Sequence, residues 1–174
     1  ILAARAAYRT GEGMVKVITC AGNRTILQQA VPEALLGTPD DLDRSVEWAD
    51  VIAVGPGLGK SAEALSCLEG VIYGSKLPLL ADADALNLLA EHPELRAALA
   101  EQGAAGRKVI LTPHVGELAR LTGQSVSACA EELLSCGIAL ASELHAVVTA
   151  KDARTLICGE GHDVCVNLSG SNGM

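Results

Sequence analysis

Four short segments of the sequence hold residues that could bind or react with a ligand, and each follows an apolar run typical of a buried β-strand. They are residues 55–61, 82–87, 112–117 and 151–155. In open parallel sheets, ligands bind beyond the carboxyl ends of the strands. The four segments are therefore the candidate site, provided that the strands before them belong to one sheet.

The first segment reads Gly55-Pro56-Gly57-Leu58-Gly59-Lys60-Ser61 and puts three glycines between a strand and the start of a helix. Its spacing is not that of a P-loop, because Val54 stands where the first glycine would be, and it is not G-x-G-x-x-G either. Glycines let the backbone approach a ligand closely, and a helix N-terminus offers N–H groups. A plain tight turn is the alternative, and the sequence leaves both open.

The second and third segments carry carboxylates and an imidazole. Asp82 and Asp84 flank one alanine, so in an extended segment they share a face and could contact a metal, a sugar hydroxyl or a cation. Alternatively, Asp84 caps the next helix while Asp82 accepts hydrogen bonds from nearby N–H groups. His114 follows the strand Val109–Leu111, which predicts that it faces the ligand edge of the sheet. Glu117 falls in the first turn of a helix, where its charge is stabilised.

The fourth segment brings Lys151 and Arg154 to a strand end in an acidic chain. A charged run is commonly a solvated turn. This one precedes a hairpin rather than a helix, which is an unusual place for a purely structural lysine. We therefore keep it as a candidate binding segment.

Six cysteines are present, and none forms a C-x-x-C pair. We expect reduced thiols in a cytoplasmic protein. Cys158, His162 and Cys165 lie close together, but they offer three of the about four ligands that a structural metal needs. We interpret them as parts of a β-hairpin whose turn is Gly159–Asp163.

Strand-like and helix-like segments alternate along the chain, which is typical of β-α-β crossovers and a parallel sheet. Strands are expected at Met14–Thr19, Asp50–Val54, Leu77–Ala81, Val109–Leu111, Ala146–Ala150, Thr155–Cys158 and Val164–Asn167. Helices are expected at Arg24–Ala30, Asp41–Trp48, Ser61–Tyr73, Ala85–Glu91, Glu94–Glu101, Gly116–Leu121 and from Ser125 or Ser127 to Leu144. The continuous apolar strands indicate a sheet that is covered on both faces.

The composition excludes several classes of function. A chain of 174 residues has the size of one domain, and no internal boundary is evident. A net charge of −8 disfavours a duplex or an anionic membrane as the main partner, and 2% aromatic residues disfavour a base-stacking surface. No apolar run approaches the about 18–20 residues of a membrane span. We therefore expect neither nucleic acid nor a membrane as partner.

Taken in order, these segments resemble those of the ADP/ATP-dependent NAD(P)H-hydrate dehydratases, a family of the ribokinase-like superfamily. The resemblance runs over the whole chain, and its most specific piece is Thr112-Pro113-His114-Val115-Gly116-Glu117. It implies a three-layer α/β/α fold with a mainly parallel central sheet and a C-terminal β-hairpin. Residues 1–174 would form a single domain of this kind that is incomplete at both termini.

The resemblance also implies a reaction, the repair of hydrated NADH or NADPH (NADHX or NADPHX). The ring hydroxyl is phosphorylated by ADP or ATP, with Mg²⁺ expected, and phosphate is then eliminated. The implied substrate-binding residues are Gly55, Gly57, Gly59, Asp84, Asn87 and His114, and the implied nucleotide-binding residues are Lys151, Asp152, Ala153, Arg154, Thr155, Gly170 and Gly173. The general base, an aspartate, is expected beyond Met174, so no residue of this chain is assigned that role.

Two departures from the family pattern stand out. Val115 replaces a usual proline, and Asp152 puts a carboxylate where glycine is common, which should weaken the nucleotide site unless a cation intervenes. One alternative is a ribokinase-like vitamin kinase for a hydroxymethylpyrimidine or thiazole alcohol. Another is a non-catalytic nucleotide-binding module. The Thr-Pro-His-x-Gly-Glu segment favours the dehydratase, and the family resemblance implies a homo-oligomer.

Overall fold

A computed structural model describes residues 1–169 and divides the chain into two compact units, Ile1–Ala49 and Asp50–Met174. The expectation of one domain over the whole chain stays a prediction. Within the described residues, none of the helices combines the length and the apolar character needed to cross a membrane.

The first unit is a small α/β body with a two-stranded parallel sheet. Its elements are α1 (Leu2–Thr10), β1 (Lys16–Ile18), η1 (Ala21–Asn23), α2 (Arg24–Ala30), β2 (Leu35–Gly37), η2 (Pro39–Asp41) and α3 (Leu42–Trp48). Strand β1 pairs with β2 in parallel. Ala4, Val31 and Ala34 form the buried core of this unit.

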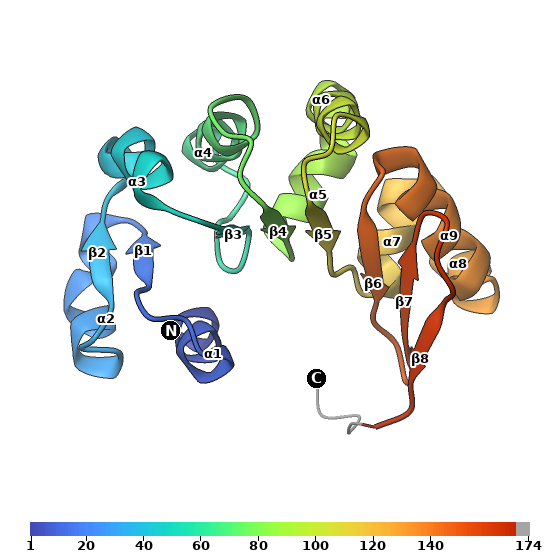
Figure 1. The fold of residues 1–174 in the computed structure, drawn as a ribbon, viewed down its shortest axis with the longest axis horizontal. Coiled ribbons are helices and arrows are strands. Elements are labelled where there is room, and N and C mark those ends of the chain that lie inside the picture. Colours follow the sequence, from blue (N-terminus) through green and yellow to red (C-terminus); the bar gives the residue numbers. More distant parts are fainter. Residues whose placement is uncertain (170–174) are drawn as a thin grey trace. The chain divides into compact units, whose positions relative to one another are not determined.

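The second unit is built on a six-stranded sheet with the order β3-β4-β5-β6-β7-β8 (Figure 1). Its strands are β3 (Ile52–Val54), β4 (Leu79–Ala81), β5 (Val109–Leu111), β6 (Val147–Ala150), β7 (Thr155–Gly159) and β8 (Cys165–Asn167). Its helices are α4 (Ala62–Tyr73), α5 (Asp84–Glu91), α6 (Pro93–Ala104), α7 (Val115–Thr122), α8 (Val126–Glu131) and α9 (Leu133–Leu144). The first four strands are parallel, and β7 and β8 form the antiparallel hairpin. The mainly parallel sheet and the C-terminal hairpin are confirmed.

All three crossovers of this sheet advance in the same direction, from β3 to β4 to β5 to β6. Because such crossovers are right-handed, their helices all lie on one face of the sheet. Side-chain burial agrees with this arrangement. The paired residues Val54, Ala81, Leu111 and Val148 are buried on that face.

The opposite face of the sheet is apolar and largely open. Its paired residues include Ile110 and Val147, whose side chains are 40% and 37% exposed. The sequence predicts that helices cover both faces of the sheet. Within residues 50–169, the helices cover one face. The second helical layer of the expected three-layer fold is not among the described elements of this unit.

One local feature was missed in the sequence, and one prediction was wrong. The strand β2 was not predicted, because three residues that end in Gly37 are too short to show an alternating pattern. Strand β1 pairs with β2 and not with a strand of the six-stranded sheet. The single long helix expected up to Leu144 is two helices, α8 and α9, separated at Glu132, whose φ of −112° and ψ of 36° are not helical. Sequence periodicity continues across this break and therefore hides it.

Substitutions on the two faces of β5 should have unequal effects on stability. Leu111 is fully buried, and Leu111→Ala should lower the free energy of unfolding by about 2–5 kcal/mol. Ile110→Ala removes a similar side chain from the open face and should cost about 1 kcal/mol or less. Urea denaturation of the 174-residue protein measures both. Equal losses would show that both faces of β5 are covered.

Candidate functional site

The four candidate segments meet at one edge of the large sheet. They follow β3, β4, β5 and β6, which are consecutive, parallel neighbours, so their carboxyl ends point the same way (Figure 1). Ligands bind at this edge in open parallel sheets. The sequence prediction that these segments share one edge is confirmed.

The glycine segment after β3 is held by its close approach to the segment after β4. Gly55, Gly57 and Gly59 all have positive φ, at 118°, 71° and 78°. A Cβ atom on residue 55 would lie 1.8 Å from the carbonyl oxygen of Asp82. Only glycine fits there, because a side chain would force the two segments apart. At Gly57 a Cβ atom would meet nothing within 4 Å.

The two aspartates after β4 point to different neighbours. Asp84 Oδ2 accepts a hydrogen bond of 2.8 Å from the N–H of Gly59, and Asp82 Oδ1 accepts one of 2.9 Å from Lys151 Nζ. Between them, Ala83 has φ 51° and ψ −118°, a strained conformation for a residue with a side chain. The predicted shared face is therefore wrong, because this backbone is not extended.

Neither alternative for the aspartates holds in full. Ala83, not Asp84, is the N-cap of α5, and no side chain caps that helix end. Asp82 is paired with an ammonium group rather than with backbone donors alone. The carboxylates thus tie the β4 end to β3 on one side and to β6 on the other.

Asp82 is held in its charged form. Burial raises the pKa of its carboxyl, but hydrogen bonds from Lys151 and Thr112 and the charge of Lys151 outweigh burial and lower the pKa below its ordinary value. The side chains of Asp82 and Lys151 are 27% and 30% exposed. Because both side chains are partly buried, water and salt screen the attraction between them less than that of an ion pair on the surface.

His114 lies outside the core, as predicted, and caps α7. Its Nδ1 accepts hydrogen bonds from the N–H groups of Gly116 and Glu117, at 3.0 and 3.4 Å. Because Nδ1 is an acceptor, the neutral ring carries its proton on Nε2. The side chain is 55% exposed. It can therefore present an N–H donor at the ligand edge.

Two neighbours fix the orientation of the His114 ring. The buried carboxylate of Glu117 accepts a hydrogen bond of 2.9 Å from the backbone N–H of His114 and lies 3.4 Å from its Nε2. Gly116 leaves room for the ring, because a Cβ atom there would lie 2.9 Å from Cε1 of His114. The Gly-Glu pair after the histidine thus has a physical role in positioning it.

Lys151 lies directly beside His114 in the backbone. The two residues form a parallel β-bridge, and the N–H of Lys151 donates to the carbonyl of Pro113 over 2.7 Å. The segments predicted to bind the substrate and the nucleotide are thereby adjacent.

The remaining predicted residues have varied surroundings. Asn87 Oδ1 accepts a hydrogen bond of 2.9 Å from Arg120 Nε, which links α5 to α7. Asp152, Ala153 and Arg154 are exposed in the turn before β7, whose first residue is Thr155. Gly170 and Gly173 lie outside the described residues.

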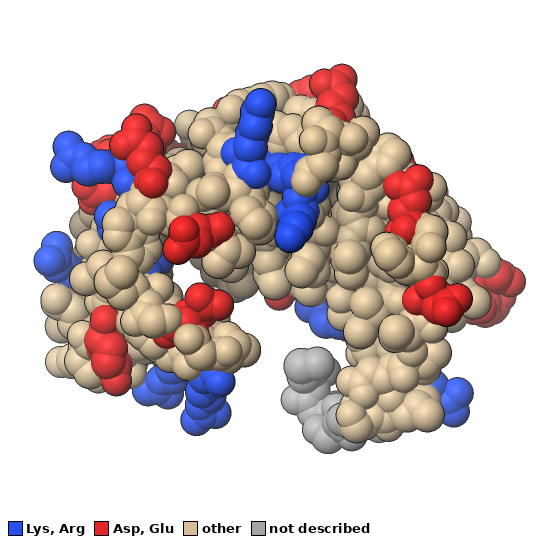
Figure 2. Space-filling model, in the orientation of Figure 1, with Lys and Arg blue, Asp and Glu red and all other residues tan. Residues whose placement is uncertain are grey.

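The acidic composition leaves little positive charge at this edge. Figure 2 shows acidic and basic side chains scattered over a face that is mostly uncharged. In the four segments at this edge, the cationic side chains are Lys60, Lys151 and Arg154. An anionic ligand at this edge would therefore meet single cations rather than a basic surface.

The Cys158, His162 and Cys165 group is part of a hairpin, as predicted. Cys158 is buried and Cys165 is exposed, on β7 and β8. Burial raises the pKa of the Cys158 thiol. Among residues 1–169, no three His, Cys, Asp or Glu side chains form a group that could hold a metal ion.

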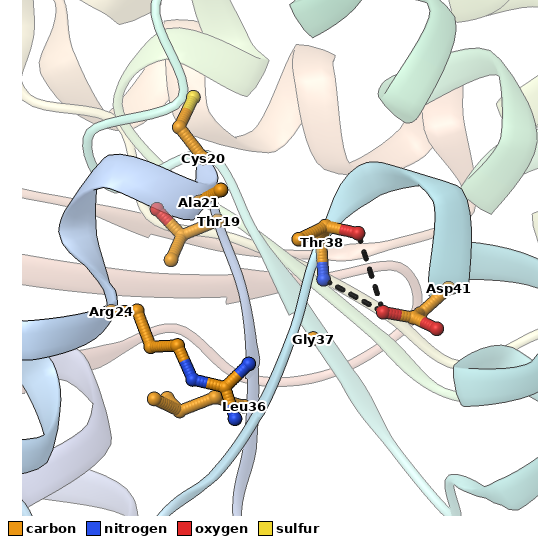
Figure 3. A pocket seen from close by; sticks show the side chains of 8 residues that line it. All are labelled: Thr19, Cys20, Ala21, Arg24, Leu36, Gly37, Thr38 and Asp41. Atoms are coloured by element: carbon orange, nitrogen blue, oxygen red, sulfur yellow. Dashed lines mark hydrogen bonds between the residues drawn. The ribbon is translucent and has the colours of Figure 1, made fainter.

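Two further cavities lie in the described part of the chain, one in each unit. One of about 70 Å³ is in the first unit and is lined in part by Arg24, Leu36, Thr38 and Asp41; Thr38 and Asp41 are hydrogen-bonded to each other there (Figure 3). Another of about 550 Å³ lies at the amino ends of β5 and β6, lined in part by Arg107, His145 and His162. Sequence reasoning missed both, because their lining residues form no motif.

The contact between Gly55 and Asp82 predicts a difference between two glycine substitutions. Gly55→Ala adds a clash to a left-handed φ and should lower the free energy of unfolding by about 2–5 kcal/mol. Gly57→Ala is the matched control. It should lower the free energy of unfolding by only about 1–2 kcal/mol, because its φ is also left-handed but its Cβ atom meets no neighbour. Thermal and urea denaturation measure both. If the two variants lose equal stability, the close approach does not hold the turn.

Comparison with known proteins agrees with this architecture. The family model described as NAD(P)H-hydrate dehydratase matches residues 1–174. The bifunctional NAD(P)H-hydrate repair enzyme Nnr of Escherichia coli K12 is 37% identical over 171 residues, which are 97% of this chain and 31% of that protein. The chain thus spans about a third of this curated relative.

Solved structures give the same result. A ribokinase-like superfamily protein from Enterococcus faecalis has a TM-score of 0.83 and 28% identity, over 99% of this chain and 59% of that one. The ADP/ATP-dependent NAD(P)H-hydrate dehydratase of Bacillus subtilis, co-crystallized with ATP and Mg²⁺, has a TM-score of 0.76 and 27% identity, over 98% and 58%. With its ribokinase-like fold and a family match over residues 1–174, the chain belongs to the NAD(P)H-hydrate dehydratase family.

Proposed function

We propose that this protein uses ADP or ATP to dehydrate NADHX or NADPHX and so restores NADH or NADPH. One observation carries the proposal: Lys151 and His114 lie side by side at the ligand edge of a sheet of this family. A nucleotide at Lys151 and a hydrated dinucleotide at His114 would bring phosphoryl donor and acceptor together.

The proposed reaction has two stages. The ring hydroxyl gives its proton to a general base while its oxygen bonds to the terminal phosphorus of the nucleotide, and the bond from that phosphorus to the leaving nucleotide oxygen breaks. Phosphate then leaves with the electron pair of the C–O bond, and the neighbouring ring carbon gives its proton to water, which restores the double bond. Positioning and charge stabilisation supply most of the catalysis in phosphoryl transfer. Glycine N–H groups and a lysine suit such a task.

We assign the substrate side to Gly55, Gly57, Gly59 and His114, with Asp84 and Asn87 supporting it. Asp84 fixes the N–H of Gly59, and Asn87 fixes Arg120. His114 would donate from Nε2 to the hydrated dinucleotide.

We assign the nucleotide side to Lys151–Thr155, together with Gly170 and Gly173. Lys151 supplies a point charge for a phosphate oxygen. Asp82 and Asp84 diverge and do not make a Mg²⁺ site, so we propose that Mg²⁺ enters with the nucleotide phosphates. No step here depends on a metal held by the protein.

A cytoplasmic location and a homo-oligomer remain part of the proposal. The first rests on the cysteine composition and the second on the family.

Turnover of hydrated NADH tests the function directly. The complete protein that carries residues 1–174 should regenerate NADH, followed by its absorbance, only with ADP or ATP present. Hydroxymethylpyrimidine is the matched alternative substrate. Phosphorylation of that alcohol without turnover of hydrated NADH would favour the vitamin kinase, and binding without turnover would favour the non-catalytic module.

Two substitutions at His114 should separate its capping role from its substrate role. Asparagine is a good N-cap, so His114→Asn should keep the stability of the protein, whereas His114→Ala should lose about 1 kcal/mol. Both should lower kcat/KM for hydrated NADH by about 5–150-fold, which corresponds to one lost hydrogen bond of about 1–3 kcal/mol.

Glu143→Gln provides the control, because it breaks an ion pair between α9 and Arg96 of α6, away from the strand ends. It should leave kcat/KM unchanged. If His114→Asn retains full kcat/KM, His114 is a cap and nothing more.

A further inference from the structure

The ion pair between Asp82 and Lys151 joins two strand ends that are not neighbours. Asp82 follows β4 and Lys151 follows β6, with β5 between them (Figure 1). Thr112, which follows β5, lies close enough to the Asp82 carboxylate to help lower its pKa. Three consecutive strand ends therefore contribute to one polar array that centres on Asp82.

Both ends of the Lys151 side chain are fixed. At the backbone, its N–H donates to Pro113 and its strand bridges to His114. At the tip, its ammonium lies 2.9 Å from Asp82 Oδ1. A lysine has a long flexible stem, and without a partner its ammonium would sample many positions. The ion pair removes that freedom before any ligand binds.

Asp82 itself sits on a rigid turn. Its N–H donates to the carbonyl of Val54 over 3.1 Å, and its carbonyl accepts from Ala85 over 3.2 Å. The strained backbone of Ala83 follows it, and Gly55 packs directly against its carbonyl. Strain of this kind persists only where the surroundings enforce it, and it clusters at functional sites.

We propose that Asp82 is a positioning residue, which holds the ammonium of Lys151 where it meets the phosphoryl group that passes from nucleotide to substrate. This inference rests on the proposed function. Asp82 forms no bond to substrate in this scheme and acts through Lys151. Its negative charge would not attract a phosphate, so its contribution lies in orientation rather than in nucleotide affinity.

This role predicts a split between kinetic constants. Asp82→Asn keeps the shape of the side chain but removes its charge. It should lower kcat by roughly 10–100-fold, because small misplacements of a catalytic group have effects of that size. The KM for the nucleotide should stay within about threefold of the wild-type value, because Asp82 itself makes no bond to the nucleotide. If Asp82 had a purely structural role, Asp82→Asn would lower the amount of folded protein, and the folded fraction would keep the wild-type kcat.

A double-mutant cycle in the complete protein tests the inference. Wild type, Asp82→Asn, Lys151→Met and the double variant are assayed with hydrated NADH over a range of nucleotide concentrations. Glu143→Gln is again the control, because it removes the charge from another ion pair between elements. Lys151→Met should lower kcat/KM for the nucleotide, and adding Asp82→Asn to it should change activity by less than about threefold.

Each other outcome overturns the inference. Losses that multiply in the double variant would show that Asp82 acts independently of Lys151, and an unchanged kcat in Asp82→Asn would show that it does not act. If Asp82→Asn does not fold, Asp82→Glu, which keeps the charge and shifts its position, is judged by the same criteria. If the wild-type protein does not turn over hydrated NADH, the proposed function is wrong and this inference falls with it. If the wild-type protein is active but the losses of activity in the two single variants multiply in the double variant, only this inference is wrong.

Discussion

The turn Asp82-Ala83-Asp84 is the constraint on which the arrangement of the candidate site depends. One carboxylate holds the glycine segment after β3, and the other holds the lysine after β6. The two can diverge only because Ala83 adopts a positive φ, which costs roughly 1–3 kcal/mol. The surrounding sheet enforces this conformation, so the strain of one residue orients groups on both sides of β4.

The general fold could be predicted from the sequence because its signals are local and repeated. Apolar runs such as Val109–Leu111 alternate with helices that have clear starts, such as Ser61, whose hydroxyl caps α4 as expected. The pairing of β1 with the short β2 and the break at Glu132 were missed. Both depend on backbone geometry and packing that no periodic pattern reveals.

The site could be predicted in part. Its segments were found because parallel strands bring their carboxyl ends to one edge, and this holds for His114 and Lys151 alike. The partners of the side chains could not be found. The pairing of Asp82 with Lys151 crosses an intervening strand, and the direction of each aspartate depends on the φ of Ala83. The place of Lys151 before a hairpin singled it out in the sequence, but nothing there pointed to Asp82 as its partner.

In the proposed mechanism, the nucleotide meets Lys151 at the edge organised by Asp82, Ala83 and Asp84. A crystal structure of the complete protein with a non-hydrolysable ATP analogue tests it most directly. We expect a phosphate oxygen about 2.7–2.9 Å from Lys151 Nζ. Asp82 should still contact that ammonium, and the N–H of Gly59 should still donate to Asp84. Nucleotide seated elsewhere, such as in the cavity lined by His145 and His162 at the opposite edge of the sheet, would contradict it.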